Sequence, residues 1–146
     1  MYHYSESGLP NVYLKNGYSI DVIDDEEYTS IDDLEGLHRV LARTIASKAM
    51  PLTKAEFKFL RIELNLSQRI LGKRFGVSEQ TIARYEKGQS DIPRTTDAAL
   101  RSLYMESIKQ NNSVSFFLDL LANYEAEQAA HEILLEEIDR QWKLAV

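Results

Sequence analysis

The chain has 146 residues, of which 44% are hydrophobic and 27% are charged, and its net charge is −6. This composition provides a core for one ordinary domain, or for a small domain with appendages, and excludes disorder throughout. The chain has no cysteine, which excludes disulfides and thiolate zinc sites, and it has neither a signal-peptide pattern nor the roughly 18-residue apolar run of a membrane span. We therefore expect a cytoplasmic protein with no membrane segment.

The first segment, residues 1–52, is acidic and begins with a strand pattern. Apolar residues alternate on both sides of Asn16-Gly17, at Val12, Leu14, Tyr18, Ile20 and Val22. An Asn-Gly dipeptide between such runs favours a tight turn, so we predict a small β-hairpin centred on it. The acidic run over 24–27 that follows is expected to be a solvated turn or loop.

Helix signals begin at Ser30, where the polar residues of Ser30-Ile31-Asp32-Asp33 can cap a helix start. Helical spacing then relates Leu34, Leu37, Leu41 and Ile45, which predicts a helix to about Ser47. Met50-Pro51 breaks this helix and indicates a linker near 48–52.

The central segment, residues 53–105, carries start and stop signals for consecutive short helices. The spacing of Thr53 and Glu56 is that of a capping box, while Ser67 and Ser78 can each cap a further helix. Glycines at 76 and 88 can end these helices. The predicted helices are 54–64, 68–75, 79–87 and a fourth that begins at Pro93. Two short helices joined by Gly-Val-Ser, with shared apolar residues Ile70, Leu71, Val77 and Ile82, predict a helix-turn-helix.

Positive charge is confined to this central segment. Between Thr53 and Tyr104 there are ten Lys or Arg and six Asp or Glu, whereas the segments before and after it each carry a net charge of −5. Basic charge on the one segment with a recognition-helix pattern is expected of a protein that binds double-stranded DNA. The alternative is a helical bundle whose basic groups are merely solvated.

The strings LSQ, GVSEQTIARYEKG and IPR resemble the Xre and lambdoid phage repressor class of helix-turn-helix domains. They look most like the DNA-binding half of MqsA-type antitoxins, in which ELNLSQ and SRYEKG-like strings also occur. The resemblance covers about a third of the chain. It implies a five-helix repressor-like domain. With the hairpin predicted above for the N-terminal segment and the long C-terminal helix that the apolar pattern described below predicts, we expect a mainly α fold.

The resemblance also implies which residues read DNA bases. Gln80 and Arg84 are four positions apart on one face of the third helix. Arginine can bind guanine O6 and N7 together, glutamine can bind adenine N6 and N7, and each such pair contributes about 1–3 kcal/mol of discrimination. Glu79 and Thr81 are secondary candidates for base contacts.

Other positions match residues that hold the DNA backbone or the scaffold. Backbone contacts are expected from Gln68, Ser78, Lys87 and from Lys73 or Arg74. Arg94 follows Pro93 as in phage repressors, where the matching arginine approaches a narrow minor groove. Arg61 and Glu86 match a buried ion pair of that class, so we expect them to be structural.

The last segment, residues 113–146, carries an apolar stripe with steps of three and four residues, formed by Phe117, Leu121, Tyr124, Gln128, His131, Leu135, Ile138 and Trp142. This pattern predicts one long amphipathic helix. The helix either folds back on its own domain or forms the seam of a homodimer. A dimer would place two recognition helices about one DNA turn apart on a palindromic operator.

No metal, cofactor or catalytic site is expected. MqsA-type relatives hold zinc through cysteines near the N-terminus, whereas this chain has Ser5 and Ser7 there, and serine is a poor zinc ligand. His3, Glu6 and His38 could in principle bind a metal, but isolated histidines are more often structural. No glycine-rich phosphate loop, nucleophile elbow or HExxH motif is present, so we do not expect an enzyme.

The sequence therefore predicts a DNA-binding repressor. Its refinement is the autoregulating antitoxin of a toxin-antitoxin pair, which adds a toxin protein as a partner. The alternative is a protein-interaction module that binds a partner through its acidic N-terminal segment and C-terminal helix, with vestigial DNA contacts.

Overall fold

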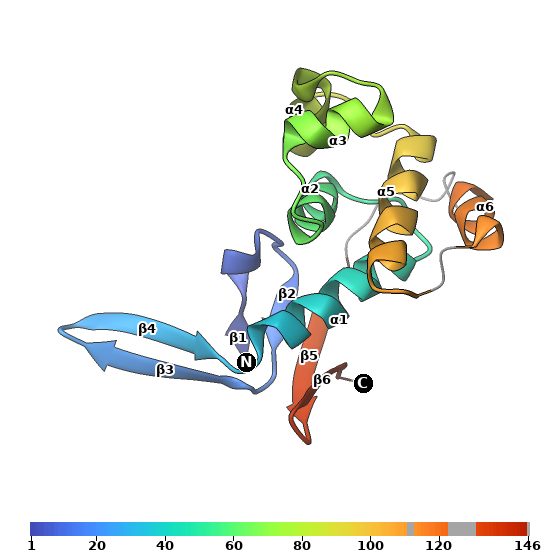
Figure 1. Cartoon of the computed structure of the whole chain (residues 1–146). Coiled ribbons are helices and arrows are strands. Elements are labelled where there is room, and N and C mark those ends of the chain that lie inside the picture. The colour runs from blue at the N-terminus through green and yellow to red at the C-terminus, as the bar shows by residue number, and fades with distance from the viewer. Residues whose placement is uncertain (111–112, 123–130, 146) are drawn as a thin grey trace. The chain divides into compact units, whose positions relative to one another are not determined.

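A computed structural model describes residues 1–110, 113–122 and 131–145, and the chain divides into two compact units. The sheet unit comprises residues 1–41 and 131–146, and the helical unit comprises residues 42–130 (Figure 1). Helix α1, Leu34–Ser47, begins in the first unit and ends in the second. Asp33 caps it, because its Oδ1 accepts a hydrogen bond from the Gly36 N–H at 3.1 Å.

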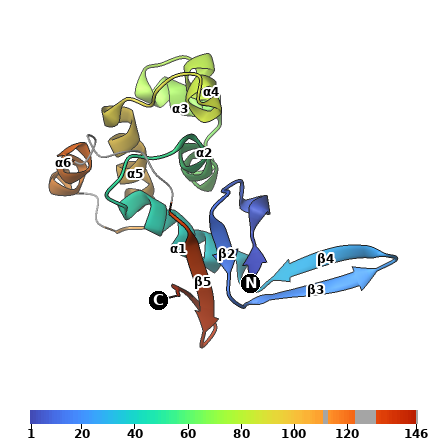
Figure 2. The same cartoon turned by 180° about the vertical axis from the view of Figure 1, so that it is seen from behind.

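The sheet unit is built on four strands in the order β1-β2-β5-β6, and Figure 2 shows the two central strands, β2 and β5, side by side. Their bounds are Tyr2–His3, Val12–Leu14, Ile133–Ile138 and Gln141–Leu144. A short 3-10 helix, η1 (Ser5–Ser7), lies between β1 and β2. Strands β2 and β5 pair in parallel, whereas the pairs at either side are antiparallel. The last two strands of the chain, β5 and β6, thus complete a sheet that its first residues begin.

The predicted hairpin is wrong in its position. Strand β3 (Tyr18–Ile23) pairs with β4 (Glu26–Ile31) as a separate two-stranded ribbon, and the turn between them is Asp24-Asp25. Both aspartates have positive φ, 52° and 66°, as a two-residue type I′ turn requires. Asp24 and Asp25 therefore form the turn that the sequence pattern predicts at Asn16-Gly17.

Asn16 and Gly17 instead contact residues near the C-terminal end of the chain. The Asn16 amide donates to the Glu137 carbonyl oxygen at 3.2 Å and accepts from the Glu137 N–H at 2.6 Å. The Cα of Gly17 lies so close to the Trp142 ring that a Cβ there would overlap the ring. The indole N–H of Trp142 donates to the Asp32 carbonyl oxygen at 2.8 Å, which holds the ring in place.

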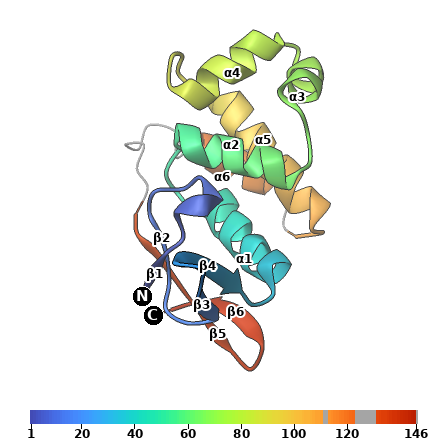
Figure 3. The same cartoon turned by 90° about the vertical axis from the view of Figure 1, so that its left-hand side faces the viewer.

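The helical unit contains the four consecutive helices that the sequence predicts for its central segment (Figure 3). Their bounds are α2 Lys54–Glu63, α3 Gln68–Phe75, α4 Glu79–Lys87, α5 Arg94–Ser107 and α6 Val114–Ala122. The core is formed by fully buried side chains from α2 to α5, namely Phe57, Leu60, Leu71, Ile82 and Leu100. The five-helix layout is matched in part, because residues 53–105 hold four helices and the fifth, α6, packs beside α5.

The predicted single C-terminal helix over 113–146 is wrong. Helix α6 ends at Ala122, and the chain returns as β5 and β6 around an Asp139-Arg140 turn with φ of 53° and 64°. Positions 124 and 128 of the predicted stripe lie outside the described residues. Leu135 is fully buried in the sheet and Trp142 is 5% exposed. Strand pairing therefore buries two apolar residues whose spacing would also suit one face of a helix. The predicted dimer seam is therefore not formed by one long helix.

Candidate nucleic-acid interface

Helices α3 and α4 and the turn between them are held by local caps. The Ser67 hydroxyl oxygen accepts from the Ile70 N–H at 3.0 Å, and the Ser78 hydroxyl oxygen accepts from the Thr81 N–H at 3.1 Å. Gly76 and Gly88 end the two helices with φ of 72° and 73°, a left-handed conformation that favours glycine. These four signals are local in the sequence, and each lies where the sequence predicts it.

Gly72 allows α3 to lie close against the turn. A Cβ at this buried position would be 2.7 Å from the Val77 carbonyl oxygen, a backbone atom that cannot move aside as a side chain could. Gly72 is not among the residues for which the sequence pattern predicts a role. Its signal is a glycine within a predicted helix, which often marks close packing.

One side of α4 is anchored in the core. Ile82 is fully buried, and Tyr85 is 6% exposed with its ring edge-on to Phe57 at 5.8 Å. At 3.6 residues per turn, Gln80 and Arg84 lie on the opposite side of the helix, and both are exposed. Their side chains are therefore presented to solvent by a helix whose rotation the core determines.

Some polar groups in the first turn of α4 form hydrogen bonds within the helix cap. The hydroxyl groups of Thr81 and Ser78 share a hydrogen bond of 2.8 Å, and Thr81 is half-buried. Glu79 is exposed in the same turn. Thr81 is thus less free than Glu79 to contact a ligand.

An ion pair joins α4 to α2. The Arg61 guanidinium donates to both carboxylate oxygens of Glu86, at 2.6 and 2.9 Å, and a third bond reaches the Leu66 carbonyl oxygen at 2.9 Å. The side chains of Arg61 and Glu86 are 11% and 3% exposed. The Gln68 amide also donates to Glu86, at 3.0 Å. One carboxylate therefore connects α2, α3 and α4.

The exposed side chains of this segment carry a more positive net charge than the segment as a whole, because some of its charged side chains are buried. Eight of the ten basic side chains between Thr53 and Tyr104 are exposed, namely Lys54, Lys58, Arg69, Lys73, Arg74, Arg84, Lys87 and Arg94. Of the six acidic side chains, Glu56, Glu86 and Asp97 are internal. Within the segment, three acidic and two basic side chains are therefore internal, because Glu56 pairs with Lys48, which precedes the segment.

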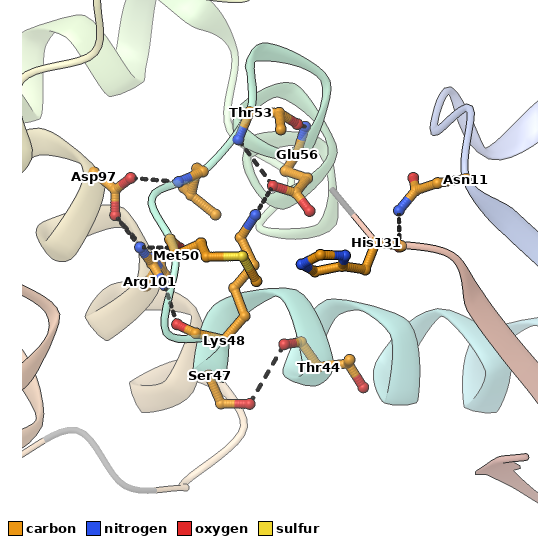
Figure 4. Close-up of polar contacts among 11 residues, drawn as sticks. Asn11, Thr44, Ser47, Lys48, Met50, Thr53, Glu56, Asp97, Arg101 and His131 are labelled. Carbon is orange, nitrogen blue, oxygen red and sulfur yellow. Dashed lines mark hydrogen bonds and ion pairs between the residues drawn. The ribbon is translucent and has the colours of Figure 1, made fainter. Parts of the chain in front are cut away.

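The linker before α2 is fixed by a second buried network (Figure 4). Arg101, 1% exposed, donates to Asp97 at 2.7 Å and to the carbonyl oxygens of Lys48 and Met50 at 2.7 and 3.0 Å. Asp97 also accepts from the Leu52 N–H at 2.7 Å. These contacts attach the linker to α5, and because they join residues about 50 positions apart, no local sequence pattern predicts them.

The residues weighed for metal binding take part in other contacts. The His3 imidazole donates to the Pro10 carbonyl oxygen at 2.9 Å, His38 Nε2 shares a hydrogen bond with the Tyr4 hydroxyl at 2.7 Å, and Glu6 accepts from the Tyr2 hydroxyl. Within residues 1–110, 113–122 and 131–145, no group of three or more His, Asp or Glu side chains could hold a metal ion. In the same ranges, no helix has the length and apolar character of a membrane span.

The geometry defines a helix-turn-helix module of the DNA-binding class. Residues 57–99 match a family model described as helix-turn-helix, which is of the Xre and lambda-repressor type. The match supports a DNA-binding transcription regulator. No curated protein and no solved structure matches the chain.

Proposed function

We propose that the protein is a sequence-specific repressor that places α4 in the major groove of an operator. The observation that carries this proposal is the exposure of Gln80 and Arg84 on the side of α4 opposite its buried residues. A helix fits the major groove, where each base pair presents a distinct pattern of donors and acceptors. The exposed cations of the same unit supply the attraction to phosphate.

Arg84 and Gln80 carry sequence discrimination in this proposal. Arg84 binds guanine and Gln80 binds adenine, each through two hydrogen bonds. Glu79 can accept from a cytosine amino group, and Thr81 offers its methyl group to thymine while its hydroxyl is bonded to Ser78.

A second group of residues holds the phosphates. Lys73 and Arg74 are exposed on α3, Lys87 is exposed on α4, and Ser78 is exposed at the cap that precedes α4. Arg94 is exposed at the start of α5, where we propose that it approaches the minor groove. Gln68 keeps one amide N–H for a phosphate because Glu86 accepts only the other. The Arg61–Glu86 pair orients Gln68 and so acts on DNA indirectly.

We further propose that a homodimer binds a palindromic operator. Two-fold symmetry in a protein and in its DNA site correspond, because each protomer contacts one half-site. Light scattering of the intact protein, with and without operator, tests this step. A stoichiometry of one protomer per operator would refute it.

The central experiment compares the two proposed roles, base discrimination by Arg84 and phosphate binding by Lys87. Operator fragments selected from genomic DNA are titrated with the intact protein at several salt concentrations. Arg84→Ala should lose about 1–3 kcal/mol of preference for the operator over a sequence with a changed base pair. Lys87→Gln should weaken binding to all sequences and reduce the salt slope by about 1.

Lys109→Gln is the matched control for Lys87→Gln. It removes the same charge from an exposed position just beyond the C-terminal end of α5, about 20 Å along the helix axis from Arg94. Its salt slope should equal that of the wild type. If Arg84→Ala and Lys87→Gln reduced the preference for the operator over the altered sequence by the same amount, the assigned roles would be refuted.

The refinement that we propose is an autoregulating antitoxin. It rests on the resemblance of the LSQ and ARYEKG strings to MqsA-type antitoxins. The test has two parts, binding to the protein's own promoter and relief of growth arrest caused by the product of the neighbouring gene. Failure of the second part would remove the antitoxin role and leave the repressor.

A further inference from the structure

The ribbon formed by β3 and β4 is an exposed projection of the sheet unit. In the described part of the chain, these two strands pair only with each other, and Figure 1 shows them extending away from the four-stranded sheet. The base of the ribbon is held by Tyr18, whose ring lies 5.2 Å from that of Tyr2. Beyond Tyr18, β3 is exposed along its whole length.

Large apolar side chains lie uncovered on both faces of the ribbon. Successive residues of a strand point to opposite faces, so Ile20 and Val22 share one face, and Ile23 lies on the other with Tyr28, the neighbour of Asp21 across the strands. Their exposed fractions are 47%, 66%, 58% and 49% in that order. An isolated two-stranded hairpin is marginally stable in water, and clustered exposed apolar residues mark interaction sites.

Charge decides which kind of molecule can cover these faces. Residues 18–31 carry five acidic groups and no basic group, and the sheet unit as a whole carries thirteen acidic and four basic groups. This charge repels DNA, and it also repels the same ribbon of a second copy. A protein surface that combines basic and apolar side chains complements both the charge and the uncovered faces.

We propose that the β3–β4 ribbon is the docking site for a basic protein partner. The partner's apolar groups cover Ile20 and Val22 on one face, or Ile23 and Tyr28 on the other, while its Lys and Arg side chains meet the acidic groups around the turn. This inference goes beyond operator binding, because the ribbon and α4 belong to different units of the chain.

The test compares variants of the full-length protein. Ile20→Thr with Val22→Thr removes apolar surface but keeps β-branched residues that favour a strand. Asp21→Asn with Glu27→Gln removes charge at nearly constant size. Ile138→Thr is the matched control, because Ile138 is an isoleucine that is 43% exposed at the end of β5, outside the ribbon.

Each immobilised protein is exposed to nuclease-treated extract of its own cells, and proteins retained by the wild type are purified for direct titration. The expected result is a basic protein whose affinity falls about tenfold or more in the Ile20/Val22 variant, as for the loss of a central apolar contact. Its affinity should also fall in the charge variant and with added salt. Ile138→Thr should bind it as the wild type does.

Three outcomes would overturn the proposal. The first is that no retained protein depends on the ribbon, and the second is that the dependent partner is acidic. The third is that the ribbon variants lower the mass in light scattering, since the ribbon would then bind a second copy. Operator affinity should stay at the wild-type value in every variant, because the ribbon takes no part in DNA binding. If the wild-type protein itself failed to bind an operator, that result would refute the repressor proposal and leave the ribbon proposal standing.

Discussion

Removal of Glu86 should destabilise the helical unit more than any surface change in it. Arg61 donates two hydrogen bonds to this carboxylate, at 2.6 and 2.9 Å, and would keep only its bond to the Leu66 carbonyl oxygen. Because the Arg61 side chain is 11% exposed, water cannot fully replace the lost partner. Breaking such a buried pair costs about 3–5 kcal/mol of unfolding free energy, which we expect for Glu86→Ala.

Removal of both charges should cost much less than the sum of the single changes. In Arg61→Met with Glu86→Leu, no uncompensated charge remains, and apolar side chains of similar volume fill the site. The coupling energy in this double-mutant cycle, with Arg61→Met and Glu86→Leu as the singles, should exceed about 1 kcal/mol. Gln68 loses its acceptor in the double variant, so some loss of stability is expected to remain.

The two units can be followed by different signals in one urea titration. Far-UV circular dichroism reports mainly the helical unit, and the single tryptophan, Trp142, reports the sheet unit. The coupling energy is measured from the dichroism transition. Additive losses, within about 0.5 kcal/mol, would show that the ion pair does not hold α4 to α2 and would refute the argument.

Three further substitutions test the packing of each unit. Gly72→Ala should cost about 1–3 kcal/mol in the dichroism transition, because its Cβ would lie 2.7 Å from the Val77 carbonyl oxygen; an unchanged midpoint would contradict the close approach. Gly17→Ala should displace the Trp142 ring and shift its fluorescence, since the residue also has φ of 76°; a native spectrum would be contrary evidence. Leu135→Ala should cost about 2–5 kcal/mol in the fluorescence transition, because Leu135 is fully buried in the sheet unit; a loss seen only by dichroism would place this residue in the helical unit instead.

The helix-turn-helix could be predicted closely because its determinants are local. Ser67 and Ser78 cap helices through N–H groups three residues ahead, and Gly76 and Gly88 end helices through their own backbone conformation. Such signals can be recognised without knowledge of the rest of the fold. The exposure of Gln80 and Arg84 follows from the same helical period that buries Ile82.

The sheet unit could not be predicted in the same way. Asn16-Gly17 has the composition of a hairpin turn, but Asn16 bonds to Glu137, 121 positions away in the chain. Asp24-Asp25 makes the turn instead, although aspartate adopts positive φ less readily than glycine. A local pattern cannot show that a distant strand competes for the same residues.

The sequence by itself determined the caps of α2, α3 and α4 and the face of α4 that carries Arg84, because these depend on contacts within a few residues. Only the tertiary structure decided that Leu135 and Trp142 lie in strands. Their spacing is compatible with a helix and with a strand. The pairing of β5 with β2 selects the strand, since it buries Leu135 against residues from the opposite end of the chain.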